Sequence, residues 1–178
     1  MSDFDIILRV SNGLRSNILS GLANIADFNI PRRDSVERIS SGPPDGASGA
    51  EIIASLYLYR VDILPHLRQR PAEPLNDRSS MPSPTPLRLH YLFTPCGASE
   101  AINQLMLGRS LQYFSDFPVF QLTEGSQGGS EAGVSQCRLT VDTLSTEQLA
   151  QLFTAFCTPY RTALPLFVDG ISMDSRVP

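Results

Sequence analysis

Residues Leu87 to Thr94 read LRLHYLFT, a run in which apolar and aromatic side chains alternate along the chain. Alternation with a high aromatic content is typical of a β-strand. A second run, EIIASLYLYRV from Glu51 to Val61, also alternates, but its side chains are apolar on both faces over most of its length. A strand that is apolar on both faces is typical of the middle of a covered sheet, so this second run is predicted to be a central strand.

Three segments around these strands have helical patterns. Apolar residues recur at helical spacing from Phe4 to Ile25, which predicts a long amphipathic opening helix. Gly13 and Gly21 interrupt that helix, and each costs ~1 kcal/mol relative to alanine, so we expect close backbone packing there. Gly97 to Phe114 predicts a second helix.

A third, shorter helix is predicted after Ser145, because Ser145 and Gln148 have the spacing of a capping box. Its buried face is expected to consist of Leu149, Leu152, Phe153 and Phe156.

Shorter strands are predicted at VFQL, which precedes Thr123, at Gln136 to Val141, and at Thr162 to Asp174. Pro165 places the last of these at an edge or a bulge, because proline cannot donate to a ladder of hydrogen bonds. The order of elements predicts an α+β (α/β-like) fold in which about three helices pack on a mixed β-sheet. At this length, residues 1–178 are expected to form a single domain.

Three segments are expected to be loops. Residues 41–49 are rich in glycine, serine and proline, and residues 123–133 contain GSQGGSEAG. Residues 71–86 hold five prolines and should be extended, because proline removes backbone donors. Pro71 to Pro74 also fits a minimal PxxP motif, which leaves open a monomeric adaptor that offers a polyproline ligand.

The composition argues against several classes of protein. Of the 178 residues, 18% are charged and the net charge is −4; all 14 basic residues are arginine, and they are scattered. A nucleic-acid groove needs concentrated positive charge, so nucleic acid is not an expected partner. No apolar run approaches the ~20 residues of a membrane span, and the acidic start MSDFD does not resemble a secretory leader. A reducing cytoplasm is the compartment that we expect for this chain.

Residues with catalytic chemistry are few. The three cysteines form neither a disulfide framework nor a zinc pattern, the glycine-rich stretches match no nucleotide-binding motif, and no cofactor is expected. Cys96 stands at a predicted strand-to-helix turn, where a helix N-terminus lowers the pKa of a thiol. His90 could serve it as a base only across roughly 20 Å of extended strand. A cysteine-dependent hydrolase or thiol enzyme that uses Cys96 is therefore the enzymatic alternative.

Four groups of segments together resemble a known family: SDFDIILRVSNGLRSNI; SLYLYRV with LRQRP; LRLHYLFTP with LMLGRSLQYF; and LSTEQLAQLFTAF with PYRTALPLFV and MDS. They are similar to the N-terminal domain of the tail-terminator, or cap, protein of phage-tail-like contractile injection systems of the Photorhabdus virulence cassette type. HYLFTP and the LGR of Leu107 to Arg109 are the most specific parts. Phe153 stands where the family leads us to expect tryptophan. Members of the family often continue into a second domain.

The resemblance implies a non-enzymatic structural protein, a hexameric ring that closes the baseplate-distal end of the tube and sheath. Its partners would be other copies of itself and the sheath and inner-tube proteins, assembled in the cytoplasm within a particle that is released or membrane-anchored. Subunit contacts are expected at Arg15, Arg109, Arg161, Phe167 and Asp169. The strand from Thr162 to Asp174 is a candidate edge for accepting a neighbour's strand, the alternative being an edge that Pro165 shields.

Overall fold

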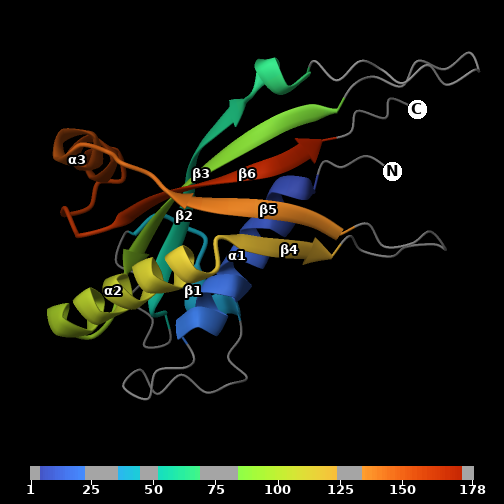
Figure 1. The fold of residues 1–178 in the computed structure, drawn as a ribbon. Coiled ribbons are helices and arrows are strands. Elements are labelled where there is room, and N and C mark those ends of the chain that lie inside the picture. The colour runs from blue at the N-terminus through green and yellow to red at the C-terminus, as the bar shows by residue number, and fades with distance from the viewer. Residues whose placement is uncertain (1–4, 23–35, 45–51, 69–83, 124–133, 174–178) are drawn as a thin grey trace, which may run out of the picture.

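Within the part of the chain that the structure describes, six strands form one sheet in the order β1-β2-β3-β6-β5-β4 (Figure 1). The computed structural model describes residues 5–22, 36–44, 52–68, 84–123 and 134–173. β1 and β2 are parallel and the other neighbouring pairs are antiparallel, so the sheet is mixed, as predicted. The elements in chain order are α1 (Ile6–Leu22), η2 (Val36–Arg38), β1 (Ile39–Ser40), β2 (Ala54–Ile63), η3 (Pro65–Arg68), β3 (Thr85–Pro95), α2 (Glu100–Asp116), β4 (Val119–Thr123), β5 (Val134–Val141), α3 (Thr146–Ala155) and β6 (Leu164–Met173).

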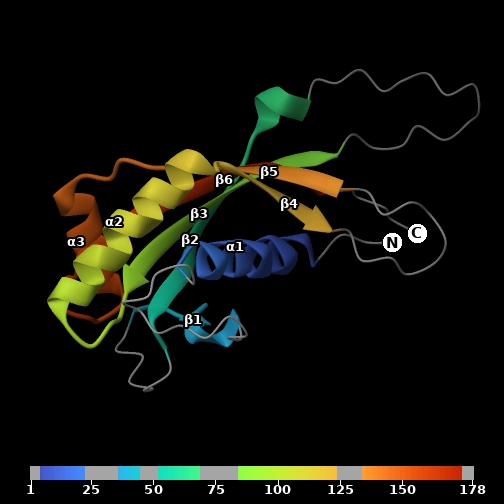
Figure 2. The same cartoon turned by 60° about the horizontal axis from the view of Figure 1, so that its bottom comes forward.

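The alternation along β3 divides the apolar side chains between the two faces of the sheet. Leu89, Tyr91 and Phe93 are fully buried in the main core, which they share with α1 and α2. Leu92 points the opposite way, into a smaller core under α3. Figure 2 shows α1 running along one face of the sheet. The α+β fold with three α-helices on a mixed sheet is thus confirmed.

Helix α1 approaches its neighbours as closely as its glycines predict. A Cβ at Gly13 would lie 2.6 Å from the side chain of Leu122, and one at Gly21 would lie 2.6 Å from the ring of Tyr113. Small residues are therefore needed where α1 crosses β4 and α2. The expectation of close packing at both glycines is confirmed.

The two remaining helices start at serine caps. Ser99 accepts a hydrogen bond from the backbone of Ile102, so α2 starts at Glu100 rather than at Gly97. Ser145 and Gln148 form the predicted capping box at the start of α3. A cap of this kind satisfies backbone donors that would otherwise lack partners, which fixes where each helix begins.

The prediction that the run from Glu51 to Val61 is a central strand is correct only at the start of β2, which lies between β1 and β3 in the sheet. Among the described residues, β2 pairs with β1 only at Ala54 and Ser55, and beyond Ser55 it pairs with β3 alone. Its two apolar faces have another cause. Leu58 packs against the main core on one face, whereas Tyr59 packs against the α3 core on the other. The apolar residues on both sides of β2 therefore indicate that both faces of the sheet are covered there. They do not indicate a paired strand on each side of β2.

Of the two positions predicted for the strand from Thr162 to Asp174, the edge is wrong, because β6 lies inside the sheet between β3 and β5. The other, a bulge, is present in β6, but at Asp169 and Gly170 rather than at Pro165. Between Leu166 and Asp169, where β6 pairs with both neighbours, it cannot accept another strand. Pro165 is tolerated because its pairing with β5 is already ending: Asp142, one residue past β5, donates its N–H to the Pro165 oxygen at 2.8 Å. The Pro165 nitrogen, which has no hydrogen to donate, thus faces the end of β5. No carbonyl of β5 needs a donor at that point.

The predicted loops need smaller corrections. Thr85 and Pro86 belong to β3 and not to the proline-rich loop, and the Pro86 oxygen accepts a hydrogen bond from Leu64. Thr123 belongs to β4 rather than to the following loop. The rest of these segments, at 45–49, 71–83 and 124–133, lies outside the described residues.

A buried tyrosine links the sheet to α1. Tyr91 is fully buried, and its hydroxyl lies 2.9 Å from that of Ser11. The Ser11 hydroxyl donates its single hydrogen to the Ile7 oxygen, so Tyr91 is the donor between the two hydroxyls. Burial raises the pKa of Tyr91 from its ordinary value of 10.0 to about 12. The folded state therefore holds the Tyr91 proton more tightly than the unfolded chain does.

We expect the free energy of unfolding to fall as the pH rises from 10 towards 12, since the unfolded chain then loses the Tyr91 proton first. The contribution of Tyr91 is complete below pH 10 and amounts to roughly 3 kcal/mol. In Tyr91→Phe this fall should be shallower, although the variant starts about 1 kcal/mol lower at pH 8 because it lacks the Ser11 hydrogen bond. Urea unfolding followed by circular dichroism at pH 8, 10 and 11.5 measures both effects. Parallel pH profiles for the two proteins would contradict the expectation.

Candidate assembly surface

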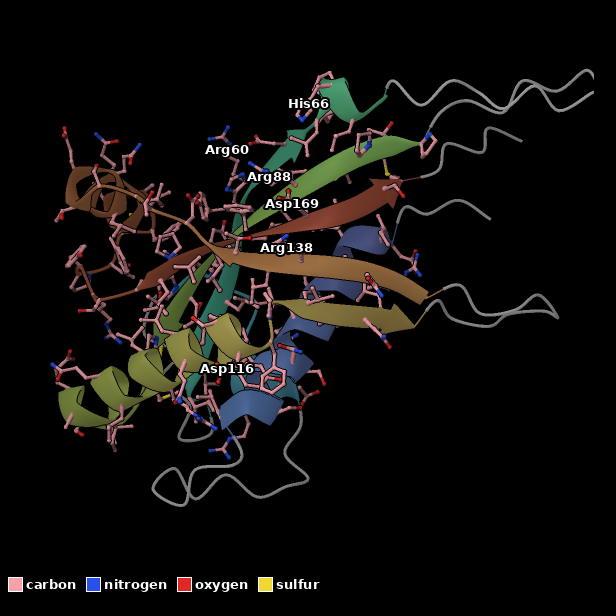
Figure 3. The ribbon with its side chains drawn as sticks, in the orientation of Figure 1. Arg60, His66, Arg88, Asp116, Arg138 and Asp169 are labelled. Carbon is pink, nitrogen blue, oxygen red and sulfur yellow. The ribbon has the colours of Figure 1, made fainter. Side chains whose placement is uncertain are left out.

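One face of the sheet carries charged residues in a row across four strands. Asp62 on β2 pairs in register with Arg88 on β3, and Asp169 on β6 pairs with Arg138 on β5. Arg88 and Asp169 are joined directly by an ion pair, so the signs alternate along the row (Figure 3). We name this surface the open face, defined by Arg60, Asp62, Arg88, His90, Arg138, Phe167 and Asp169.

The firmest contact on the open face joins Arg88 to Asp169. Arg88 Nε and Nη2 donate to the two carboxylate oxygens at 2.7 and 3.0 Å. The guanidinium also lies 4.4 Å from the centroid of the Phe167 ring. Its hydrogen bond to Asp169 raises the pKa of Arg88. Two-point pairing on an aromatic face fixes the arginine in one orientation, although a pair this exposed contributes at most about 1 kcal/mol to stability.

Two β-bulges border these groups. In β6 the two residues Asp169 and Gly170 stand opposite the single Arg88, and Gly170 has a positive φ of 84°. In β2 the register shifts between Leu58 and Arg60, so that Tyr59 is the extra residue there. A bulge stops the regular alternation of side chains along its strand. The bulge in β2 therefore sets the face on which Arg60 and Asp62 lie, whereas the bulge in β6 follows directly after Asp169.

His90, on the open face, lies between the carboxylates of Asp62 and Asp142. Its side chain is only 9% exposed, with Nε2 3.1 Å from Asp62 and Nδ1 3.6 Å from Asp142. Arg60 donates to the other oxygen of Asp62 at 2.7 Å, and this hydrogen bond lowers the pKa of Asp62. Because the two carboxylates face opposite ring nitrogens, they cannot share one metal ion with His90. Throughout the described ranges, no group of three His, Cys, Asp or Glu side chains is placed to hold a metal.

The five predicted contact residues do not form one site. Phe167 and Asp169 lie together on the open face. Arg109 is half-buried on α2, where it donates to Gln112 at 2.9 Å. Arg161 is exposed and lines a cleft of ≈ 380 Å³ between the end of β3 and the start of α2.

Arg15 instead has a role within the subunit. Its Nε donates to the Ile39 oxygen at 2.7 Å, which holds β1 against α1. Burial lowers the pKa of Arg15 and exceeds the opposing effect of Glu37.

Arg60, Asp62, Arg88 and Arg138 are residues of the open face that sequence reasoning missed. Arg60 with Asp62, Arg88 with His90, and Phe167 with Asp169 are each two residues apart on predicted strands. Residues two apart on a strand share a face, so three such pairs on three strands were a usable signal. The pairs alone did not show that the three strands are neighbours.

Cys96 does not have the environment of a reactive thiol. It is half-buried at the end of β3, and its thiol lies 3.6 Å from the Thr94 oxygen. Burial raises the pKa of Cys96, and the smaller effect of Arg161 does not reverse this. A nucleophilic cysteine needs a lowered pKa, so the geometry weakens the thiol-enzyme alternative.

We expect brief alkylation at pH 7.5 to modify Cys157 first, because it is the exposed cysteine. Cys137 is fully buried, with a pKa raised to about 11, and should react only after unfolding. Mass spectrometry of peptides after short iodoacetamide treatment, with a urea-unfolded control in which all three react, measures the order. Modification of Cys96 ahead of Cys157 would contradict it.

Comparison with known proteins places this α+β domain, built on one mixed sheet, in a family. The chain belongs to the Pvc16 N-terminal domain family, whose model matches residues 9–178. The resemblance predicted from the sequence is thereby confirmed. A comparison with curated proteins gives no match.

Among solved structures, the chain is similar to the PVC sheath/tube terminator of an extracellular contractile injection system, determined by cryo-EM in the extended state. The TM-score is 0.49 and the sequence identity 13%; the match covers 90% of this chain and 57% of that chain. In the part of the chain that the structure describes, none of the helices combines the length and apolarity needed to cross a bilayer.

Proposed function

We propose that this chain is a structural component that caps the baseplate-distal end of the tube and sheath of a contractile injection particle. The observation that carries the proposal is the match of the Pvc16 N-terminal domain family over residues 9–178, together with the family-like motifs quoted above. In this proposal the chain acts through its surfaces and forms no covalent bond with a substrate.

The physical task of a cap is to stop a polymer. A ring can do this if one face matches the last layer of tube or sheath and the opposite face offers no copy of that layer. A closed ring requires a heterologous contact, in which two different surfaces of the subunit meet with a rotation that closes. We propose six subunits, as the family resemblance implies, assembled in the cytoplasm within a particle that is released or membrane-anchored.

The open face is the surface that we propose for contact with sheath or tube protein. Its charged groups are already oriented: Arg88 by Asp169 and Phe167, and Asp62 by Arg60. Groups held in place before binding lose little entropy on binding, and alternating charges select a partner with the opposite pattern. Arg15, Arg109 and Arg161 stay proposed contacts on other surfaces of the subunit.

The test is electron microscopy of particles made with and without this chain. Without it, we expect tubes and sheaths of variable length whose ends lack a cap density, and reintroducing the wild-type chain should restore both the cap and the length. Reintroducing Asp169→Arg should restore neither, because it places a third arginine beside Arg88 and Arg138. A chain with Gln151→Arg, a substitution at an exposed position on α3, is the matched control. Particles of normal length and normal ends in the absence of the chain would contradict the proposal.

The two alternatives have less support. Residues 71–83 of the proline-rich segment lie outside the described residues, so the adaptor stays a prediction. The thiol enzyme requires a reactive Cys96, which the raised pKa of that thiol disfavours.

A further inference from the structure

His90 is buried between two carboxylates that come from different parts of the sheet. Its Nε2 lies 3.1 Å from Oδ2 of Asp62 on β2, and its Nδ1 lies 3.6 Å from Oδ2 of Asp142, one residue past β5. The rings of Tyr59 and Phe167 each have their centroids 5.9 Å from that of His90. The His90 side chain is only 9% exposed, so water has little access to the imidazole.

The protonation of the imidazole decides how many carboxylates it can satisfy. A neutral imidazole has one N–H, and its other nitrogen presents a lone pair. In either neutral tautomer, one of the two carboxylates would therefore face a lone pair with no hydrogen between them. The imidazolium has a donor on each side. The arrangement of Asp62, His90 and Asp142 thus suits the protonated ring.

The two carboxylates are not held equally firmly. Asp62 also accepts a hydrogen bond from Arg60 at 2.7 Å, and its distance to His90 is within hydrogen-bonding range. Asp142 lies farther from the ring, and its other oxygen accepts the N–H of Thr143 at 2.8 Å. When His90 loses a proton, Nε2 should therefore keep its hydrogen for Asp62, and the Asp142 oxygen that faces Nδ1 should lose its donor.

The groups around His90 come from every strand of the open face. The titratable and charged ones are Tyr59, Arg60 and Asp62 on β2, Arg88 on β3, Asp169 on β6, and Arg138 and Asp142 on or just past β5. Within the described ranges, α3 adds one charged residue, Glu147, and it is exposed.

His90 is the group on this surface that responds to pH near neutrality. Burial raises the pKa of Tyr59, and Asp142 and Asp62 raise it further. The hydrogen bond from Arg60 lowers the pKa of Asp62. Guanidinium groups and ordinary carboxylates keep their charge from pH 5 to 8, whereas histidine is the residue type that changes its charge in that range.

We propose that His90 is a pH-dependent link between the open face and the segment that leads to α3. With the second proton, His90 joins Asp62 on β2 to Asp142, three residues before the Ser145 cap of α3. Without it, His90 keeps Asp62 and releases Asp142. The link lies within one subunit and does not require a ring. The proton also adds a positive charge to the open face, so contact with sheath or tube protein would depend on pH; that consequence, unlike the link, rests on the proposed function.

NMR spectra of the isotope-labelled full chain at pH 5.5 and pH 8 test the link. The chain has two histidines, and the other one, His66 on η3, is exposed, so spectra of His66→Gln identify the signals of His90 (Figure 3). We expect both ring nitrogens of His90 to carry hydrogen at pH 5.5 and Nε2 alone to carry it at pH 8. The backbone amide signal of Thr143, which is bonded to Asp142, should shift between the same two pH values.

Three variants separate the link from a general effect of pH. His90→Gln has no charge that responds to pH, so the shift of the Thr143 amide should be lost. His66→Gln is the matched control and should keep that shift. Asp142→Asn, at a side chain that is 25% exposed, keeps an acceptor for Thr143 but no charge for His90, so here too the shift should be lost.

Two results would overturn the link. One is a Thr143 amide signal that does not move with pH, or that moves equally in wild type and in His90→Gln. The other is a His90 ring that carries one hydrogen at both pH values. Either result would leave the proposed cap intact, because particles made with and without the chain test the cap independently.

Discussion

Phe153→Ala should lower the free energy of unfolding by about 3–5 kcal/mol, the usual cost of removing a large buried aromatic side chain. Phe153 is 1% exposed and packs with Leu92 and Leu149 in the small core under α3. Its ring also meets that of Tyr160 edge-on, with centroids 5.4 Å apart. Truncation would leave a cavity between α3 and the sheet, and the cost of that cavity adds to the lost burial of the ring.

Urea unfolding followed by circular dichroism measures this loss. Phe156→Ala is the matched control: the same chemical change on the same helix, but at a half-buried residue whose main ring contact is Tyr57 at 5.0 Å. We expect it to cost about 1–2 kcal/mol, in proportion to the smaller apolar area involved. Hydrogen exchange of the α3 amides should accelerate more in Phe153→Ala. Equal losses in the two variants would show that Phe153 is not the residue that holds α3 to the sheet.

The elements of this fold could be predicted from the sequence wherever one local rule decided the outcome. The spacing of Ser145 and Gln148 correctly predicted the start of α3, and Gly13 and Gly21 correctly predicted the close packing of α1. The order of strands could not be predicted in the same way. β2 has two apolar faces because helices cover both of them, and β6 lies inside the sheet despite Pro165. Both facts depend on tertiary neighbours that no local pattern contains.

The candidate site was predicted only in part, for a related reason. Phe167 and Asp169 were expected as contact residues and do lie together, but their partner Arg88 was missed. Strict alternation assigns each side chain to one face of a strand, whereas a bulge inserts an extra residue and changes the assignment. The insertion at Tyr59 moves Arg60 and Asp62 to the face that carries Arg88, and no local sequence pattern reveals that insertion. Asp169 reaches Arg88 by the regular register, which requires knowing that β6 pairs with β3.

Gly170→Ala should lower the free energy of unfolding by about 2–4 kcal/mol, because two separate costs add at this position. Gly170 has a φ of 84°, a conformation that costs other residues roughly 1–2 kcal/mol. An added Cβ would also lie 2.6 Å from the backbone oxygen of Gln136, and forced overpacking costs typically 1–3 kcal/mol. A backbone oxygen in a paired strand cannot swing aside as the end of a side chain can, so β6 or β5 must shift.

Gly108→Ala separates this strain from the general effect of replacing glycine. Gly108 lies in a helix with nothing within 4 Å of its added Cβ, so alanine there should raise the stability of the subunit by about 1 kcal/mol. Opposite signs in the two variants, measured by urea unfolding, are the expected result. The Gly170 variant should also weaken the Arg88–Asp169 pair, because the bulge follows Asp169 directly and a shift of β6 there would move the Asp169 carboxylate. If Gly170→Ala were as stable as wild type, the bulge could relax without glycine, and the open face would not depend on it.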